Sequence, residues 1–216
     1  MNVPSGSREL VLARIRAALT DVRSDEPREE IVRDYRTTHT SDDPSAVLDL
    51  LHENLADYRA LVHRSTEAGL PALLAALLTA RGSRSVVLPP GLPDAWLADS
   101  TAELLPDDGT LTAHALDGID SVVTGCAIAV AETGTIVLDT GPGQGRRALT
   151  LVPDHHICVV RAPAQVVASL PQALPRLDPD RPQTWISGPS ATSDIELDRV
   201  EGVHGPRTLE VILLQG

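Results

Sequence analysis

The chain has 216 residues, of which 42% are hydrophobic and 2% aromatic, and its formal net charge is −12. This length fits one domain with an appended arm, and the core must be built from Leu, Val, Ala and Ile because phenylalanine is absent. The negative charge argues against binding to nucleic-acid phosphates, which requires a concentrated positive patch. The absence of lysine excludes a lysine Schiff base, a Walker-type phosphate lysine and a lysine general base.

Hydropathy and cysteine use indicate the compartment. No run approaches the ~20 apolar residues that a membrane span requires, so no span is expected. The N-terminus lacks the apolar core of a signal peptide. Cys126 and Cys158 both lie in apolar segments and are expected to be reduced core residues rather than a disulfide. The expected location is therefore cytoplasmic.

The N-terminal part of the chain is predicted to be an arm joined to a body. Helical spacing of apolar residues predicts a helix over residues 8–19, with Ser7 as its N-cap. A polar connector follows, and a second helix is predicted over residues 44–56, where Pro44 suits the first turn. We therefore predict an N-terminal helix and connector over residues 1–43 and an α/β domain over residues 44–216.

The next segments alternate between strand and helix. Strands are predicted at residues 59–63 and 85–88, on either side of a strongly apolar helix at residues 70–80. A short helix is predicted at residues 93–98, whereas residues 104–116 are ambiguous and contain at most one short strand.

The centre and the end of the chain supply further strands. Short, β-branched runs bounded by turn residues predict them at residues 127–131, 135–138, 157–160, 184–187 and 208–214. A helix interrupted by Pro171 is predicted at residues 164–174. Strands alternating with helices indicate an α/β sheet covered on both faces, and the short turns between central strands indicate some antiparallel pairs. The predicted fold class is a three-layer α/β/α sandwich with a mixed, mostly parallel sheet.

The turn AETGT, which follows an apolar strand, contains the first candidate catalytic residue. Glu132 at a strand end suits a nucleophile, a general base or a cation ligand. Thr133 and Gly134 are candidate ligand-binding neighbours, and Gly134 permits a turn with positive φ. The alternative is a carboxylate that caps backbone N–H groups in a tight turn.

The glycine-rich segment GPGQGRR is a candidate anion site. Its glycines expose backbone N–H groups, and Arg146 or Arg147 offers a bidentate fork for a carboxylate or phosphate. The segment matches neither a Walker loop nor a dinucleotide-binding fingerprint. The alternative is a flexible loop without a ligand.

The pair His155 and His156 precedes the strand predicted at residues 157–160. Adjacent residues on a strand point to opposite faces, so at most one of the two is expected to face a given site. A histidine there suits a base that removes the hydroxyl proton of a 2-hydroxy acid. The alternative is a pair of hydrogen-bonded structural histidines.

The last polar motif is ISGPSATSDIE, followed by GVHGP. Ser190, Thr192 and Asp194 are predicted to crowd a helical turn that offers hydroxyl and N–H groups to an anion, although N-capping alone also explains them. His204, flanked by glycines, is expected to approach the same region. The Cys and His spacings predict no zinc site, and the absence of GxSxG gives no support to a serine triad.

Two long motifs carry a family resemblance. AETGT followed by GPGQGRRALTLVPDHHICVV, and then ISGPSATSDIELDRVEGVHGPRTLEVILL, resemble the LUD-domain family and its lactate-utilisation protein C group. The resemblance is specific from about residue 121 to the end of the chain. It implies a fold of the NagB/ribose-isomerase/CoA-transferase class. It also implies a pocket shared by the segments GPSATSDIE and GVHGP.

The resemblance also implies a function. It indicates a subunit of a bacterial complex that oxidises L-lactate to pyruvate, with no cofactor in this chain and iron–sulfur clusters in partner subunits. We expect this chain to bind a small carboxylate such as lactate or to assemble the complex, rather than to act as an autonomous dehydrogenase. Two alternatives are an acyl-transfer enzyme of the CoA-transferase fold that uses Glu132, and a module that senses a small anion.

Overall fold

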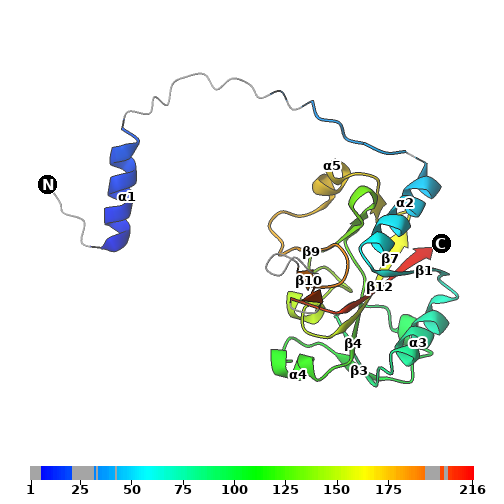
Figure 1. The fold of residues 1–216 in the computed structure, drawn as a ribbon. Helices are drawn as coiled ribbons and strands as arrows, with labels where there is room; N and C mark the ends of the chain where they lie inside the picture. Colours follow the sequence, from blue (N-terminus) through cyan, green and yellow to red (C-terminus); the bar gives the residue numbers. More distant parts are fainter. Residues whose placement is uncertain (1–5, 21–31, 33, 42, 193–199, 202–203) are drawn as a thin grey trace. The chain divides into compact units, whose positions relative to one another are not determined.

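The computed structural model describes residues 6–20, 32, 34–41, 43–192, 200–201 and 204–216. Contacts divide the chain into two compact units, Met1–Tyr35 and Arg36–Gly216. The first unit contains helix α1 (Ser7–Ala18), which buries none of its residues. Figure 1 shows this helix in blue. Its apolar side chains are between 46% and 55% exposed at Leu10, Val11, Ile15 and Leu19, the last at the C-cap.

The second unit is built on a six-stranded sheet in which every neighbouring pair is parallel. The strand order is β1-β12-β7-β4-β2-β3. The bounds are β1 Leu61–Thr66, β2 Ser85–Leu88, β3 Glu103–Pro106, β4 Ser121–Thr124, β7 His155–Ala162 and β12 Thr208–Gln215. Strands β7 and β12 are interior strands of this sheet and are mostly apolar and buried on both faces, as expected of a sheet covered on both sides.

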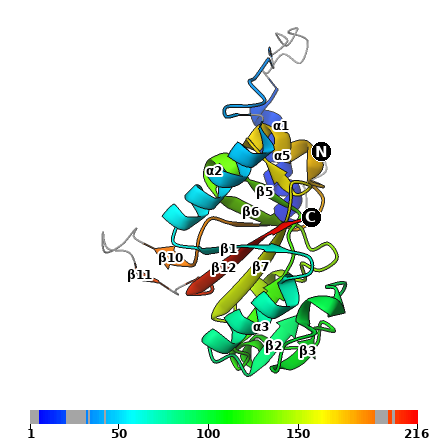
Figure 2. The ribbon, with the colours of Figure 1, turned by 90° about the vertical axis from the view of Figure 1, so that its right-hand side faces the viewer.

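Helices cover the two faces of this sheet. Helices α2 (Pro44–Asp57) and α3 (Leu70–Ala80) lie on opposite sides of β1, β12 and β7 (Figure 2). The 3-10 helix η1 (Asp94–Leu97) packs with α3. On the other face, α4 (Ala113–Asp117) and η3 (Arg147–Thr150) enclose a smaller cluster that contains Leu116 and Leu149.

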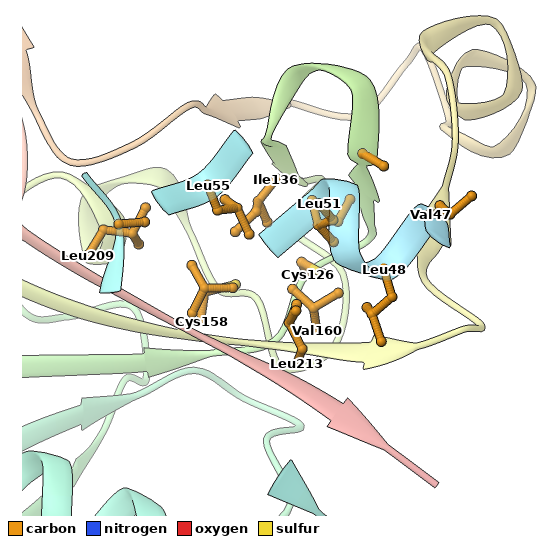
Figure 3. Close-up of a cluster of buried hydrophobic side chains, with 14 of the residues drawn as sticks. Val47, Leu48, Leu51, Leu55, Cys126, Ile136, Cys158, Val160, Leu209 and Leu213 are labelled. Atoms are coloured by element: carbon orange, nitrogen blue, oxygen red, sulfur yellow. The ribbon is translucent and has the colours of Figure 1, made fainter. Parts of the chain in front are cut away.

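Strand alternation assigns the side chains to two cores. Cys158 and Val160 of β7 join the cluster under α2, whereas Ile157 and Val159 join the cluster under α3. Figure 3 shows the first cluster, in which Leu48, Leu51 and Leu55 of α2 lie above β7 and β12. Both cysteines are free thiols within this cluster.

A second, four-stranded sheet packs beside α2. Its order is β8-β5-β6-β9, with bounds β5 Ile128–Val130, β6 Thr135–Leu138, β8 Val166–Val167 and β9 Thr184–Ile186. Strands β5 and β6 are antiparallel and joined by η2 (Ala131–Thr133), whereas β5 and β8 are parallel. Two further short strands, β10 (Ala191–Thr192) and β11 (Val200–Glu201), pair with each other.

The structure confirms the α/β class and corrects its details. The predicted single mixed sheet is wrong, because the antiparallel pair lies in the separate small sheet and the main sheet is wholly parallel. The helix predicted at residues 164–174 is also wrong in its first half. Residues Val166–Val167 form β8, and helix α5 spans only Leu170–Ala173 before the 3-10 turn η4 (Leu174–Arg176). Pro171 lies in the first turn of α5, where its ring fits without a kink.

The helical turn predicted after Gly188 is likewise wrong. Ser190 donates its backbone N–H to Pro206 O, and the next residues form strand β10. Asp194 and most of the segment that follows lie outside the described residues. Within the described part of the chain, no helix combines the length and apolarity needed to cross a membrane.

Candidate functional site

The two adjacent histidines open β7 at the amino-terminal edge of the main sheet. They form the first two residues of the strand rather than preceding it. Both are buried, and their hydrogen bonds confirm that they point to opposite faces. His155 Nδ1 lies 2.8 Å from Ser121 Oγ, and His156 Nε2 lies 2.7 Å from Thr124 Oγ1. Each face has its own cavity.

The cavity on the His156 face, here called the Arg147 cavity, has a volume of about 310 Å³. It brings together four residues that the sequence predicts for a site, namely Arg147, His156, Ser190 and His204. Ser190 Oγ accepts the backbone N–H of His204 at 3.0 Å. The two C-terminal motifs therefore meet in one cavity, as predicted. Thr192 lies in β10, and Asp194 falls outside the described residues.

Arg147 is the cationic side chain of this cavity. It is exposed at the start of η3, and no acidic side chain of the described residues pairs with it. An arginine without a partner presents its full fork of N–H donors, which matches a carboxylate. The indole of Trp185, 42% exposed, and Leu209 supply apolar surface in the same cavity.

His156 lines this cavity as an uncharged side chain. Burial, the larger effect, and the neighbouring His155 lower the pKa of His156 to about 3. The imidazole is therefore neutral near pH 7 and too weakly basic to hold a proton there. This favours a role in orienting a ligand over the predicted role as a base.

Arg146 is already engaged, in contrast to its neighbour. Its Nε and Nη2 atoms donate to the two carboxylate oxygens of buried Asp107 at 2.9 and 3.0 Å, and Nη2 also donates to Leu111 O. These hydrogen bonds raise the pKa of Arg146. Because the fork is filled from within the chain, Arg146 has little left to offer a ligand.

The glycine-rich loop is pinned by hydrogen bonds of its own. Gly141 N donates to Asp139 Oδ1 at 3.0 Å, Gly143 N to Pro90 O at 2.8 Å, and Gln144 N to Gly141 O at 3.1 Å. Donors that the fold uses in this way are not free to surround an anion. The loop thus shapes the carboxyl ends of β2 and β3 instead of forming the predicted backbone cradle.

Glu132 lies in a different environment, in the turn η2. Its Oε1 accepts the backbone N–H of Leu170 at 2.7 Å, and its Oε2 lies 3.0 Å from His39 Nδ1. Burial raises the pKa of Glu132, but the hydrogen bonds from Leu170, His39 and Ser169 outweigh it and lower the pKa. Thr133 Oγ1 donates to Thr135 Oγ1, and Gly134 adopts φ +56. This arrangement matches the capping alternative, since Glu132 accepts the first backbone N–H of α5.

The face of His155 carries a network that sequence reasoning did not identify. Glu210 of β12 is only 3% exposed. It accepts Nε of Arg81 at 3.1 Å, and its carboxylate lies 2.8 Å from His63 Nε2 and 3.3 Å from His155 Nε2. The last contact falls short of a well-aligned hydrogen bond. Burial raises the pKa of Glu210, but its contacts with His155, Arg81 and His63 outweigh burial and lower the pKa to about 2.

A polar cavity of about 760 Å³, here called the His155 cavity, opens on this network. Arg81, Ser83 and His155 line it together with three aspartates. His204 lines both this cavity and the Arg147 cavity. A signal for Glu210 was present in the sequence, because a carboxylate inside the apolar run TLEVILL needs buried partners.

Metal binding receives no support from the geometry. Within the described residues, no group of three or more His, Cys, Asp or Glu side chains is arranged to hold an ion. Cys126 and Cys158 are buried, and the neighbouring Cys158 thiol, the larger effect, together with burial raises the pKa of Cys126 well above its ordinary value.

Comparison with known proteins identifies close relatives. The family model of the LUD domain matches residues 94–214. The chain is 45% identical over 178 residues to the lactate utilization protein C of Deinococcus radiodurans, covering 79% of this chain and 82% of that protein. It is 34% identical over 102 residues to the Exiguobacterium protein of the same name, covering 44% of each chain. A crystal structure of a DUF162 family protein from Deinococcus radiodurans matches with a TM-score of 0.69 and 38% identity, covering 82% of this chain and all of that one.

Proposed function

This chain belongs to the LUD-domain family, and we propose that it serves in bacterial L-lactate utilisation as a non-autonomous subunit that binds a small carboxylate. The observation that carries the proposal is the Arg147 cavity. An arginine with no acidic partner among the described residues lines it together with His156, Ser190 and His204. Its volume of about 310 Å³ is at the lower end of the roughly 300–1,000 Å³ of small-molecule pockets.

The role of each residue follows from its chemistry. Arg147 would hold the carboxylate of lactate through two parallel N–H···O bonds. Neutral His156, held by Thr124, would orient the substrate. His204 and Ser190, tied together by a hydrogen bond, would contact the hydroxyl end.

Oxidation of lactate to pyruvate releases two electrons, for which this chain offers no acceptor. Iron–sulfur clusters supply one-electron transfer when bound, but an iron–sulfur site takes four cysteines and this chain has two, both buried in the core. The residues present do not fit a cluster. We therefore assign the clusters to partner subunits and give this chain the task of binding and presenting the carboxylate or assembling the complex.

The finer fold assignment is part of the same proposal. We place the body in the NagB/ribose-isomerase/CoA-transferase class. A parallel sheet covered on both faces, with a smaller sheet beside it, supports that assignment. Acyl transfer through Glu132 has less support, because both carboxylate oxygens are engaged by Leu170 and His39. A sensing module would use the Arg147 cavity without turnover.

Calorimetric titration with L-lactate tests the carboxylate site directly. We expect the wild-type chain to bind and Arg147→Gln to lose at least about tenfold in affinity, since a charge-assisted pair is worth about 1.5–3 kcal/mol. Arg84→Gln is the matched control, because Arg84 is 90% exposed and lines neither the Arg147 cavity nor the His155 cavity. Equal affinity in wild type and Arg147→Gln would contradict the assignment.

The subunit role needs a second experiment. The tagged chain is purified from its native host and assayed for lactate-dependent dye reduction. Recovery of iron–sulfur partners with activity supports the complex. Binding of lactate by a chain that comes out alone, with no turnover, would favour the sensing module.

A further inference from the structure

We propose that Ser83 is a nucleophile for small activated esters, served by a proton relay that runs through Ser121 and His155 to Glu210. The proposal concerns the His155 cavity and does not depend on carboxylate binding by Arg147. It rests on four side chains in contact: Ser83 Oγ lies 2.6 Å from Ser121 Oγ, Ser121 Oγ 2.8 Å from His155 Nδ1, and His155 Nε2 3.3 Å from Glu210 Oε1.

Ser83 is less buried than the other three side chains, so the relay leads from the cavity into the protein interior. Ser121, His155 and Glu210 are at most 5% exposed, whereas Ser83 is part-buried and lines the cavity. One end of the relay is therefore a buried charge, and the other is a hydroxyl that a ligand can reach. A structural network has no need of a chain of hydroxyls that leads from the carboxylate to an open cavity.

The proton positions follow from the carboxylate. Glu210 is ionised, since its hydrogen bonds keep its pKa at about 2, and an ionised carboxylate only accepts. In the neutral imidazole, Nε2 therefore carries the proton towards Glu210, and Nδ1 accepts the Ser121 hydroxyl. Because the single Ser121 proton is then used, Ser83 donates to Ser121 Oγ. Every donor points from the cavity towards the buried acid, as the activation of Ser83 by a base requires.

The chemical step balances along this path. Ser83 Oγ forms a bond to the ester carbonyl carbon while its proton passes to Ser121 and the Ser121 proton passes to His155 Nδ1. The imidazolium is stabilised by Glu210 and returns a proton through Ser121 to the departing alkoxide, giving an alcohol and an acyl-serine. Water then attacks the acyl-serine and gives one proton to the relay. The relay returns this proton to Ser83 Oγ as the acyl–oxygen bond breaks, which releases the carboxylic acid and restores free Ser83.

The lining of the cavity limits the substrate. The charged residues Arg81, Arg207, Asp117 and Asp154 line the cavity together with Ser83, which favours a polar acyl group over an apolar one. Arg81, which donates Nε to Glu210, retains further N–H groups for the oxygen that becomes negative in the transition state. A GxSxG turn is not needed, because the four side chains come from different segments. Ser121, His155 and Glu210 meet through the parallel register of β4, β7 and β12, and Ser83, which precedes β2, contacts Ser121.

Covalent labelling with a fluorophosphonate tests the proposal on the full chain. We expect a single adduct, located on Ser83 by peptide mass spectrometry and lost in Ser83→Ala. Ser65→Ala is the control, since Ser65 does not line the His155 cavity. It should label at the wild-type rate. The absence of an adduct, or equal labelling of Ser65 and Ser83, would overturn the proposal.

The relay is tested by Ser121→Ala, a small change that leaves Ser83 and His155 in place. Loss of general-base assistance should slow labelling about 10²-fold or more and flatten the pH profile of the labelling rate. Circular dichroism reports whether each variant is folded. Labelling of Ser83 in folded Ser121→Ala at the wild-type rate and with the wild-type pH profile would refute the relay.

Discussion

At the start of strand β7, the two faces of the sheet have different electrostatic environments, although His155 and His156 are neighbours in sequence. His155 lies in a charged network with a buried carboxylate, two hydroxyls and an arginine. His156 has one hydroxyl partner and stays neutral. Because successive side chains of a strand point to opposite faces, the charged network around His155 and the neutral side chain of His156 lie on opposite sides of the same strand. Substitutions of Glu210 and of His156 therefore probe the two faces one at a time.

The largest effect is expected from Glu210→Ala. The substitution leaves Arg81, His63 and His155 around a site from which the carboxylate is gone, and breaking a buried ion pair costs about 3–5 kcal/mol. The free energy of unfolding from urea denaturation measures the loss.

The control for this change is an exposed acid. Glu67 is 60% exposed and lies 4.0 Å from Arg161, so Glu67→Ala should change stability by less than about 0.5 kcal/mol. Similar losses from the two variants would show that the Glu210 network contributes no more than a surface pair.

Acid titration separates the two faces. The pKa of His156 is lowered from 6.5 to about 3, so the unfolded state takes up a proton first as the pH falls. Stability is therefore lost from about pH 6.5 down to pH 3, by about 2 kcal/mol between pH 7 and pH 5. The pKa of Glu210 is lowered from 4.5 to about 2, so the stability it contributes is intact above pH 4.5 and is lost between pH 4.5 and 2.

Urea denaturation at a series of pH values resolves these windows. His156→Gln should abolish most of the loss between pH 7 and 5, and Glu210→Gln should leave that window intact. The opposite pattern would contradict the assignment of the upper window to His156.

Local signals in the sequence predict much of the fold. Helix α3, strand β2 and strand β6 have the bounds expected from their apolar runs and flanking turns. These signals depend on neighbouring residues, which a single sequence contains. The helix predicted at residues 164–174 fails because Val166–Val167 pairs with β5 instead, a tertiary choice that outweighs helical spacing.

The candidate site was predictable only in part. Arg147, His156, Ser190 and His204 belong to motifs that the sequence marks, and they meet in one cavity. The relay joins Ser83 to Glu210 across several strands, and a register between parallel strands has no local signature. Which of two adjacent arginines is engaged depends on Asp107, which is 39 positions away.

Substitutions of these two adjacent arginines should give the smallest effects, and they test which arginine serves the fold and which serves the ligand. Arg146→Ala leaves buried Asp107 without its bidentate partner and should cost about 1–3 kcal/mol of stability. Arg147→Ala removes an exposed side chain that no described acid holds, so stability should change by less than about 0.5 kcal/mol while lactate binding weakens. Thermal unfolding and calorimetric titration of the two variants measure both effects. If Arg146→Ala proves neutral for stability and abolishes binding, the assignment of the two arginines is reversed, and the ligand lies beside the glycine-rich loop instead of His156.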